Sequence, residues 1–173
     1  MTLVIAHRGA SYDERENTLP AFERAIALGA DYVELDVQVS ADGELVVCHD
    51  VDLGRLTPLS GPLRTRTAAE LREVGIPTLA EALELMRGRI DVMAELKHAW
   101  RYRSHDVVAR TVALLAPTDV VVSFEPRALA EALRLRPTLR VIQHVGYGVT
   151  IRRAAGYAWA AGFHDPRDRK SVV

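Results

Sequence analysis

The sequence has few features that could form a disulfide bond or anchor the protein in a membrane. Cys48 is the single cysteine among 173 residues, which excludes an internal disulfide. The opening residues 1–5 lack the basic start and the long apolar run of a signal peptide. No apolar run approaches the roughly 20 residues that cross a bilayer. We therefore expect a cytoplasmic protein without an integral membrane segment, in which Cys48 is a small buried apolar residue.

An excess of charge of either sign is also absent. The chain has 22 lysines and arginines against 23 acidic residues, for a formal net charge of −1. These charges are interspersed, so no strong field attracts nucleic acid or an anionic membrane, and an anionic substrate must be held locally. With 49% hydrophobic and 26% charged residues, and no linker or repeat, the sequence predicts a single globular domain over 1–173.

Segments typical of strands alternate with segments typical of helices. Apolar runs and two-residue alternation predict strands at 3–6, 31–39, 45–48, 91–97, 119–123 and 139–143, and allow a seventh at 162–164. Apolar residues spaced three and four apart predict helices at 18–29, 78–86, 106–115, 127–135 and 148–161. Residues 51–77 form a long loop with one short helix at 68–74. This alternation predicts an α/β protein with a parallel sheet.

The predicted strand count falls short of a closed barrel. Polar residues at the C-terminal ends of parallel strands are typical of a (β/α)8 TIM barrel, which has eight strands and usually about 250 residues. We therefore expect a TIM-barrel-type fold that is truncated at its C-terminal side to about six or seven strands. Its first and last strands would be open edges, which a second copy of the chain could cover. Without such cover the barrel would be marginally stable and weakly active.

The predicted strand at 31–39 carries two acids on one of its faces. Because side chains alternate along a strand, Glu34 and Asp36 lie on one face with Tyr32 and Gln38, and apolar residues lie on the other. A half-exposed antiparallel strand has this pattern. Two acids spaced two residues apart at a strand end can also be ligands of a hard cation. The strand alone does not decide between these interpretations.

Other predicted strands also end in charged or titratable side chains. These are His7 and Arg8, then His49, and then Glu95 and Lys97. In a barrel such strand ends converge on one mouth. Three carboxylates, two imidazoles and two cations would then share a common centre.

Several short motifs occur together along residues 3–124. They are His7-Arg8-Gly9, Glu16-Asn17-Thr18, Glu34-Leu35-Asp36-Val37, Asp42-Gly43, His49-Asp50, Ile76-Pro77-Thr78-Leu79, Glu95-Leu96-Lys97 and Ser123-Phe124. In these motifs and their order the sequence resembles the glycerophosphodiester phosphodiesterase family, whose members are TIM barrels of the phospholipase C-like type. The ordered set is much more specific than any one of the motifs.

The resemblance implies hydrolysis of glycerophosphodiesters to an alcohol and glycerol 3-phosphate. It places a divalent cation, Mg²⁺ or Ca²⁺, on Glu34, Asp36 and Glu95, and carboxylate oxygens are the hard ligands that these cations prefer. Glu34 lies one layer deeper but can reach the same ion as Asp36, because residues i and i+2 of a strand are only ~6.6 Å apart. No cluster of cysteine and histidine with zinc spacing competes.

The resemblance also assigns the acid–base chemistry. His7 and His49 would be the pair that activates the attacking oxygen and protonates the leaving oxygen, a task suited to imidazoles. In this family the attacking oxygen is thought to be the substrate's own adjacent hydroxyl, which gives a cyclic phosphate that water then opens. Arg8 and Lys97 would neutralise the phosphoryl oxygens. Glu16 would orient Arg8 or a water on the cation.

Several further residues lie where they could line the mouth. Trp100 follows Lys97 together with Arg101 and Arg103. These side chains could hold a substrate head group, or they could pack as in an ordinary loop. His144 and His164 lie at or near later strand ends. For these two histidines we expect a structural role.

Which diester is cut stays open because residues 51–57 depart from the family pattern, which has an Arg-Thr pair there. A lysophospholipase D or sphingomyelinase D-like activity would use the same cation and histidines. The truncated barrel could instead be catalytically weak or inactive and only bind a phosphorylated ligand or partner. A barrel isomerase acting on a phosphorylated metabolite would leave the three carboxylates without a role. We expect a small glycerophosphodiester as the partner, and no nucleic acid.

Overall fold

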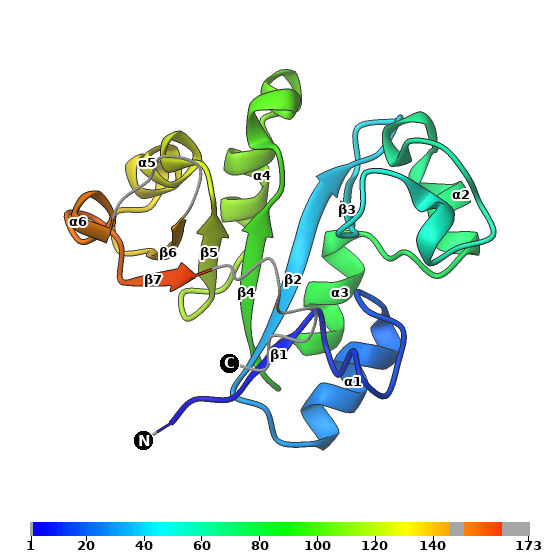
Figure 1. Ribbon diagram of the computed structural model, residues 1–173, viewed down its shortest axis with the longest axis horizontal. Helices are drawn as coiled ribbons and strands as arrows, with labels where there is room; N and C mark the ends of the chain where they lie inside the picture. The colour runs from blue at the N-terminus through cyan, green and yellow to red at the C-terminus, as the bar shows by residue number, and fades with distance from the viewer. Residues whose placement is uncertain (1, 146–150, 164–173) are drawn as a thin grey trace.

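The computed structural model describes residues 2–145 and 151–163 (Figure 1). Seven strands form one sheet: β1 Ile5–His7, β2 Tyr32–Val39, β3 Leu45–Val47, β4 Asp91–Leu96, β5 Val120–Ser123, β6 Arg140–Val145 and β7 Ala160–Phe163. The strand order is β1-β2-β4-β5-β6-β7, every neighbouring pair on this path is parallel, and β3 pairs with β2 outside the path. The prediction of an incomplete (β/α) barrel is confirmed, with six strands on the barrel path.

Helices connect the parallel strands as the sequence predicts. The α-helices are α1 Leu19–Ala27, α2 Ala68–Glu73, α3 Leu79–Met86, α4 Val107–Leu114, α5 Pro126–Leu135 and α6 Ile151–Ala154. Three short 3₁₀ segments are η1 Leu53–Arg55, η2 Leu63–Thr65 and η3 Ala99–His105. Thr18 caps α1, and Thr78 forms a capping box with Glu81 at the start of α3.

Strand β2 is buried along its entire length, and all eight of its residues are covered. Strands β1 and β4 flank its edges, and its outer side chains, such as Val33 and Leu35, belong to one core with Phe22 of α1 and Leu79 of α3. A half-exposed antiparallel strand is therefore the wrong interpretation of residues 31–39. The acids of the inner face are buried as well, so they need compensating charge.

Strand β3 does not belong to the alternating parallel series in which the predicted segment 45–48 was counted. It is antiparallel to β2, with Val39 opposite Leu45 and Val37 opposite Val47. The physical reason is the short turn at 40–44, because a parallel crossover needs a dozen or more residues. The hairpin returns the chain toward the barrel mouth, and the backbone N–H of Cys48 donates to the carbonyl of Asp36 at 2.9 Å. His49 thereby lies at the level of the acids although its strand runs in the opposite direction.

The predicted helix at 148–161 is wrong over most of its described part, residues 151–161. In its described part only Ile151–Ala154 is helical, and Ala160–Phe163 is strand β7, parallel to β6. Alanine favours helices, but pairing with the open edge of β6 satisfies more backbone groups and outweighs that preference. The seventh strand therefore begins before residue 162. His164 lies outside the described residues.

The long segment at 51–77 packs around a small core of its own beside β2 (Figure 1). The buried residues of this small core are Val46, Cys48, Leu53, Leu63, Ala68, Leu71 and Ile76. Cys48 is thus buried among apolar side chains, as expected. The predicted short helix is α2, and the remainder contains η1 and η2.

The two end strands of the path, β1 and β7, each pair with a single neighbour among the described residues. A second copy of the chain that covers these edges stays a prediction, as do the single domain over 1–173 and the cytoplasmic location. No helix of the described part of the chain is both long enough and apolar enough to cross a membrane.

Gly9 permits the tight passage from β1 to α1, and we predict that Gly9→Ala destabilises the fold severely. Its φ is +80°, and an added Cβ would lie 2.8 Å from the backbone carbon of Ala21. Left-handed strain and overpacking together should cost about 3 kcal/mol. Gly29 is the control, since it has φ +75° but open space around a Cβ, and Gly29→Ala should cost only about 1 kcal/mol. Equal urea midpoints for the two variants would contradict the prediction.

Candidate active site

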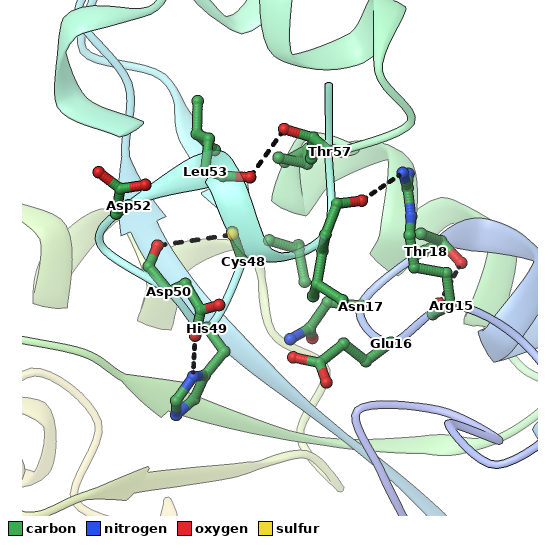
Figure 2. Close-up of a pocket in the computed structure, with 13 residues that line it drawn as sticks. Arg15, Glu16, Asn17, Thr18, Cys48, His49, Asp50, Asp52, Leu53 and Thr57 are labelled. Atoms are coloured by element: carbon green, nitrogen blue, oxygen red, sulfur yellow. Dashed lines mark hydrogen bonds and ion pairs between the residues drawn. The ribbon is translucent and has the colours of Figure 1, made fainter. Parts of the chain in front are cut away.

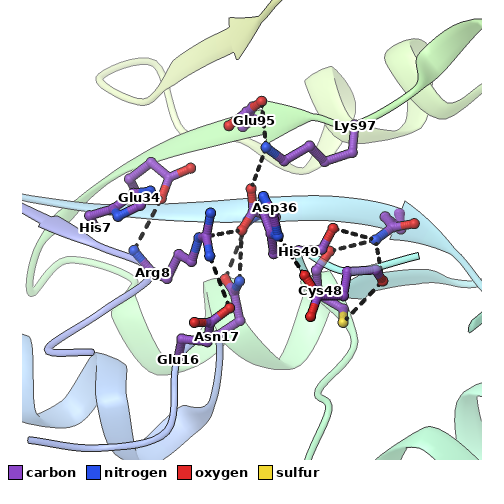
Figure 3. A network of polar contacts seen from close by, with 12 residues as sticks. His7, Arg8, Glu16, Asn17, Glu34, Asp36, Cys48, His49, Glu95 and Lys97 are labelled. Atoms are coloured by element: carbon purple, nitrogen blue, oxygen red, sulfur yellow. Dashed lines mark hydrogen bonds and ion pairs between the residues drawn. The ribbon is translucent and has the colours of Figure 1, made fainter. Parts of the chain in front are cut away.

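Three carboxylates lie together toward the C-terminal ends of the parallel strands. Glu34 and Asp36 extend from the inner face of β2, and Glu95 extends from β4, where it is the register partner of Asp36 (Figure 3). One oxygen from each of these side chains lies within 4.8 Å of the others. All three side chains are buried. The acids that the sequence suggested as cation ligands therefore lie together.

The burial of these acids sets their protonation. Burial, followed by the negative charges of Asp36 and Glu95, raises the pKa of Glu34 well above its usual value. Burial and the charge of Asp36 raise the pKa of Glu95 to about 7. Burial also acts to raise the pKa of Asp36, but Lys97 and Arg8 outweigh it and hold that pKa below its ordinary value. Asp36 is thus the most firmly ionised of the three.

Two cations compensate the buried negative charge. The Nζ of Lys97 lies 2.7 Å from Oε1 of Glu95 and 3.1 Å from Oδ1 of Asp36. Nε of Arg8 lies 3.2 Å from Oδ2 of Asp36. Burial lowers the pKa of Lys97, but the carboxylates outweigh it and the pKa rises. Both predicted phosphate-binding residues therefore line the acidic group.

The three acids fit a divalent cation. Among the described residues, Glu34 Oε1 is buried without a hydrogen bond, and the buried Asp36 Oδ1 and Glu95 Oε1 have only the Lys97 ammonium beside them, without an aligned hydrogen bond. A buried oxygen that lacks a hydrogen bond costs free energy, and a hard cation would satisfy all three oxygens at once. Oxygen donors alone suit Mg²⁺ or Ca²⁺ better than zinc.

Asn17 is a site residue to which the sequence analysis gave no role. Its Nδ2 donates to Oδ2 of Asp36 at 2.7 Å, and the backbone N–H of Asp36 donates to its Oδ1 at 3.3 Å. Asn17 has φ +57°, a conformation that asparagine tolerates better than most residues. The signal was present in Glu16-Asn17-Thr18, where an asparagine precedes the helix cap Thr18.

The two predicted catalytic histidines lie on opposite sides of Asp36 (Figure 3). Nε2 of His7 lies 3.7 Å from Oε2 of Glu34, and burial followed by the charge of Arg8 lowers the pKa of His7. Nδ1 of His49 lies 2.7 Å from Oδ1 of Asp50. A carboxylate in this position fixes the ring and favours the tautomer with its proton on Nδ1. Asp50, which received no role from the sequence, is therefore an orienting residue.

A chain of ion pairs extends from His49 to Arg8. Arg55 binds the carboxylate of Asp50 through Nε, and its Nη2 lies 2.5 Å from Oε1 of Glu16. That same oxygen accepts a hydrogen bond from Nη1 of Arg8 at 3.0 Å. Glu16 thus contacts Arg8, as its predicted orienting role requires. Segment 51–57 departs from the family pattern but still supplies this arginine, which the sequence analysis overlooked.

A small cavity lies behind His49, between the loop before α1 and the segment after β3 (Figure 2). Asn17, Cys48 and Thr57 are among its lining residues. Figure 2 shows Glu16 and His49 extending from two different segments on its lower side. The cavity separates the two segments that carry the ion-pair chain.

We predict that the Arg55 ion pairs stabilise the fold near neutral pH and that this stabilisation is lost as the pH becomes acidic. Burial opposes the effect, but Arg55 and its neighbours lower the pKa values of Glu16 and Asp50 below 4.5 and 3.8. A lowered pKa in the folded state stabilises the fold at higher pH, and this gain disappears as the pH falls through that pKa. The urea midpoints of wild type and Arg55→Met should differ most near about pH 6 and converge toward about pH 3. A difference that is constant with pH would contradict this. Half-exposure of Arg55 keeps the gain modest.

His144 lies closer to the site than the expected structural role requires. Its Nε2 is 4.0 Å from Oε2 of Glu95, and its ring stacks on Phe124 with centroids 4.7 Å apart.

Trp100 is half-exposed on η3, and its backbone N–H donates to Glu125 at 3.1 Å. Its place in a substrate loop stays a prediction.

The sheet and the acidic group at its strand ends define a TIM-barrel-type protein with a candidate cation site. The model of the glycerophosphoryl diester phosphodiesterase family matches residues 7–163, and the chain belongs to this family.

Similar proteins agree with this assignment. A glycerophosphodiester phosphodiesterase of Caldanaerobacter subterraneus subsp. tengcongensis is 45% identical over 98 residues, covering 49% of this chain and 40% of the relative. One from Bacillus altitudinis is 42% identical over 118 residues, covering 59% and 48%. The solved structure of an Oleispira antarctica phosphodiesterase in complex with the product sn-glycerol-3-phosphate has a TM-score of 0.83 at 29% identity, covering 95% of this chain and 75% of that chain. The chain spans about half the length of the curated relatives it matches.

Proposed function

We propose that this chain is a divalent-cation-dependent phosphodiesterase that hydrolyses a glycerophosphodiester to an alcohol and glycerol 3-phosphate. The observation that carries the proposal is the group of three buried carboxylates, with one oxygen of each within 4.8 Å of the others and with both histidines and both cations around it. The family and the product bound by the Oleispira antarctica protein support the same substrate class.

The residues that would hold the cation are Glu34, Asp36 and Glu95. When bound, Mg²⁺ or Ca²⁺ supplies Lewis acidity that offsets negative charge on the phosphoryl group. Asn17 orients the carboxylate of Asp36 by donating to its Oδ2, and its own Oδ1 accepts from the backbone N–H of Asp36. Arg8 and Lys97 contribute further positive charge, and the planar guanidinium of Arg8 suits two phosphoryl oxygens.

The acid–base work falls to His7 and His49. One imidazole removes the proton of a substrate hydroxyl as its oxygen forms a bond to phosphorus, and the other gives a proton to the leaving oxygen as its bond breaks. The resulting cyclic phosphate is opened by water with the two roles exchanged. Asp50 holds the ring of His49 for this transfer, and Glu16 holds Arg8. Trp100 is placed on the loop after Lys97, where it could contact a substrate head group.

Turnover by the purified chain tests the proposal. Glycerophosphocholine should be cleaved in the presence of Mg²⁺ or Ca²⁺, EDTA should abolish cleavage, and glycerol 3-phosphate should be released. Binding of glycerol 3-phosphate without any turnover would overturn the enzymatic proposal in favour of a ligand-binding protein. Faster cleavage of lysophosphatidylcholine than of glycerophosphocholine would instead indicate a lysophospholipase D.

A further inference from the structure

Gln38 is a fully buried polar residue of β2 that the proposed chemistry does not use. It lies two residues beyond Asp36 on the same inner face. Its Nε2 lies 2.8 Å from the carbonyl oxygen of Cys48, 3.1 Å from that of His49 and 2.9 Å from that of Asp50. An amide nitrogen has only two protons, so at least one of them is shared between carbonyls. One side chain therefore satisfies three consecutive peptide carbonyls.

Among the residues that the structure describes, few other hydrogen bonds hold the backbone around His49. The β2–β3 ladder ends at Val37 and Val47, and one further hydrogen bond joins the N–H of Cys48 to the carbonyl of Asp36. Beyond that point the chain leaves β2, and the Gln38 amide connects residues 49 and 50 to the strand by hydrogen bonds to their carbonyls. A buried amide with all its partners present is costly to remove, because the carbonyls of Cys48 and His49 lose this donor and that of Asp50 keeps only the weak thiol donor of Cys48 at 3.6 Å.

The amide oxygen of Gln38 also has a hydrogen-bond partner. The hydroxyl of Tyr102, in η3, donates to its Oε1 at 3.3 Å, and Tyr102 is itself buried. Tyr102 follows Lys97 on the loop after β4. The amide therefore connects two loops of the mouth, one that carries His49 and one that follows Lys97.

We propose that Gln38 is the positioning residue of His49, and that Tyr102 fixes the orientation of its amide. This inference rests on the proposed function, in which His49 transfers a proton. Asp50 orients the imidazole ring, while Gln38 sets the position of the backbone from which that ring extends. A displacement of about 1 Å in a reacting group can cost about 100-fold in rate.

The chain contains a matched control in Gln143 of β6. It is equally buried, and its Nε2 donates to the carbonyl oxygens of Ser123 at 3.1 Å and His144 at 2.7 Å. The hydroxyl of Tyr157 donates to its Oε1 at 2.5 Å. Gln143 thus repeats the chemistry of Gln38 without contacting the segment that bears His49.

Two substitutions test the proposal through catalysis. Gln38→Met keeps the length of the side chain and removes the donor, and it should lower kcat for glycerophosphocholine by about 30-fold or more while KM changes less than about threefold. Gln143→Met loses equivalent hydrogen bonds and should leave kcat within about threefold. Equal losses of kcat in both variants would overturn the proposal, since they would reflect the loss of any buried amide.

Cys48 provides a second measurement that needs no activity. It is the single cysteine of the chain, it is buried, and burial raises the pKa of its thiol to about 12, so its reaction with a disulfide reagent such as DTNB should be slow. Release of the carbonyls by Gln38→Met should speed this reaction about tenfold or more, whereas Gln143→Met should not. A Cys48 rate in Gln38→Met equal to that of wild type overturns the proposal even if the wild type proves inactive.

The tyrosine gives an independent variant if Gln38→Met does not fold. Tyr102→Phe removes only the hydroxyl and leaves Gln38 in place. It should raise the Cys48 reaction rate and lower kcat, each by about threefold or more. If both quantities match those of wild type, Gln38 needs no fixed orientation and the proposal fails.

Discussion

Asp36→Asn should remove divalent-cation binding and nearly all turnover while the fold is retained. Asp36 is fully buried at the centre of the acidic group, and Lys97 and Arg8 hold it ionised. Asparagine has almost the same shape but carries no charge, and hard cations depend on charged oxygen ligands. We expect Mg²⁺ or Ca²⁺ affinity to fall about 100-fold or more, and kcat/KM by about 1,000-fold.

Calorimetric titration with Mg²⁺ or Ca²⁺ measures this effect directly, and Asp42 offers the matched control. Its carboxylate accepts hydrogen bonds from Ser40 at 2.6 Å and from the N–H of Ala68 at 2.9 Å, so it stabilises a turn away from the acidic group. Asp42→Asn should bind the cation as wild type does. If Asp36→Asn also kept wild-type affinity, the cation site would have to be sought elsewhere in the chain.

The strand-end residues could be predicted from sequence because parallel strands impose a simple rule. Each apolar run ends at the same edge of the sheet, so polar residues just after the runs converge. Asp36 and Glu95 lie inside their strands near this edge, and they are register partners in the structure. His49 reaches the mouth by another route, through the antiparallel return of β3. Its position was expected correctly, but for a reason that does not hold in the fold.

The supporting residues were less accessible to sequence analysis because their partners lie far away along the chain. Gln38 and Tyr102 are 64 residues apart, and Arg55 binds Glu16 across 39 residues. No periodicity links such pairs, and each side chain alone is typical of an exposed polar residue. The residues around 148–161 show the same limitation for secondary structure, since pairing of β7 with β6 outweighed a local preference for helix.

His49→Ala should lower kcat by about 100- to 10,000-fold, the range in which a positioned acid or base contributes. Cation affinity should stay close to that of wild type, because the imidazole is not one of the three carboxylate donors. This separation distinguishes the histidine from Asp36, whose loss should affect both quantities. His7→Ala should give a loss of similar size. The double variant should be little worse than either single one, since residues that act in one step are strongly non-additive.

His105 is the control for removing an imidazole near the mouth. It is exposed at the end of η3, and its Nδ1 lies 3.2 Å from the hydroxyl of Ser104. His105→Ala should leave kcat unchanged. Retention of more than about a tenth of wild-type kcat by His49→Ala would remove that residue from the acid–base pair, because even the weakest positioned acids and bases contribute more. The proton would then have to come from another group at the mouth, and His144, 4.0 Å from Glu95, would be the next residue to replace.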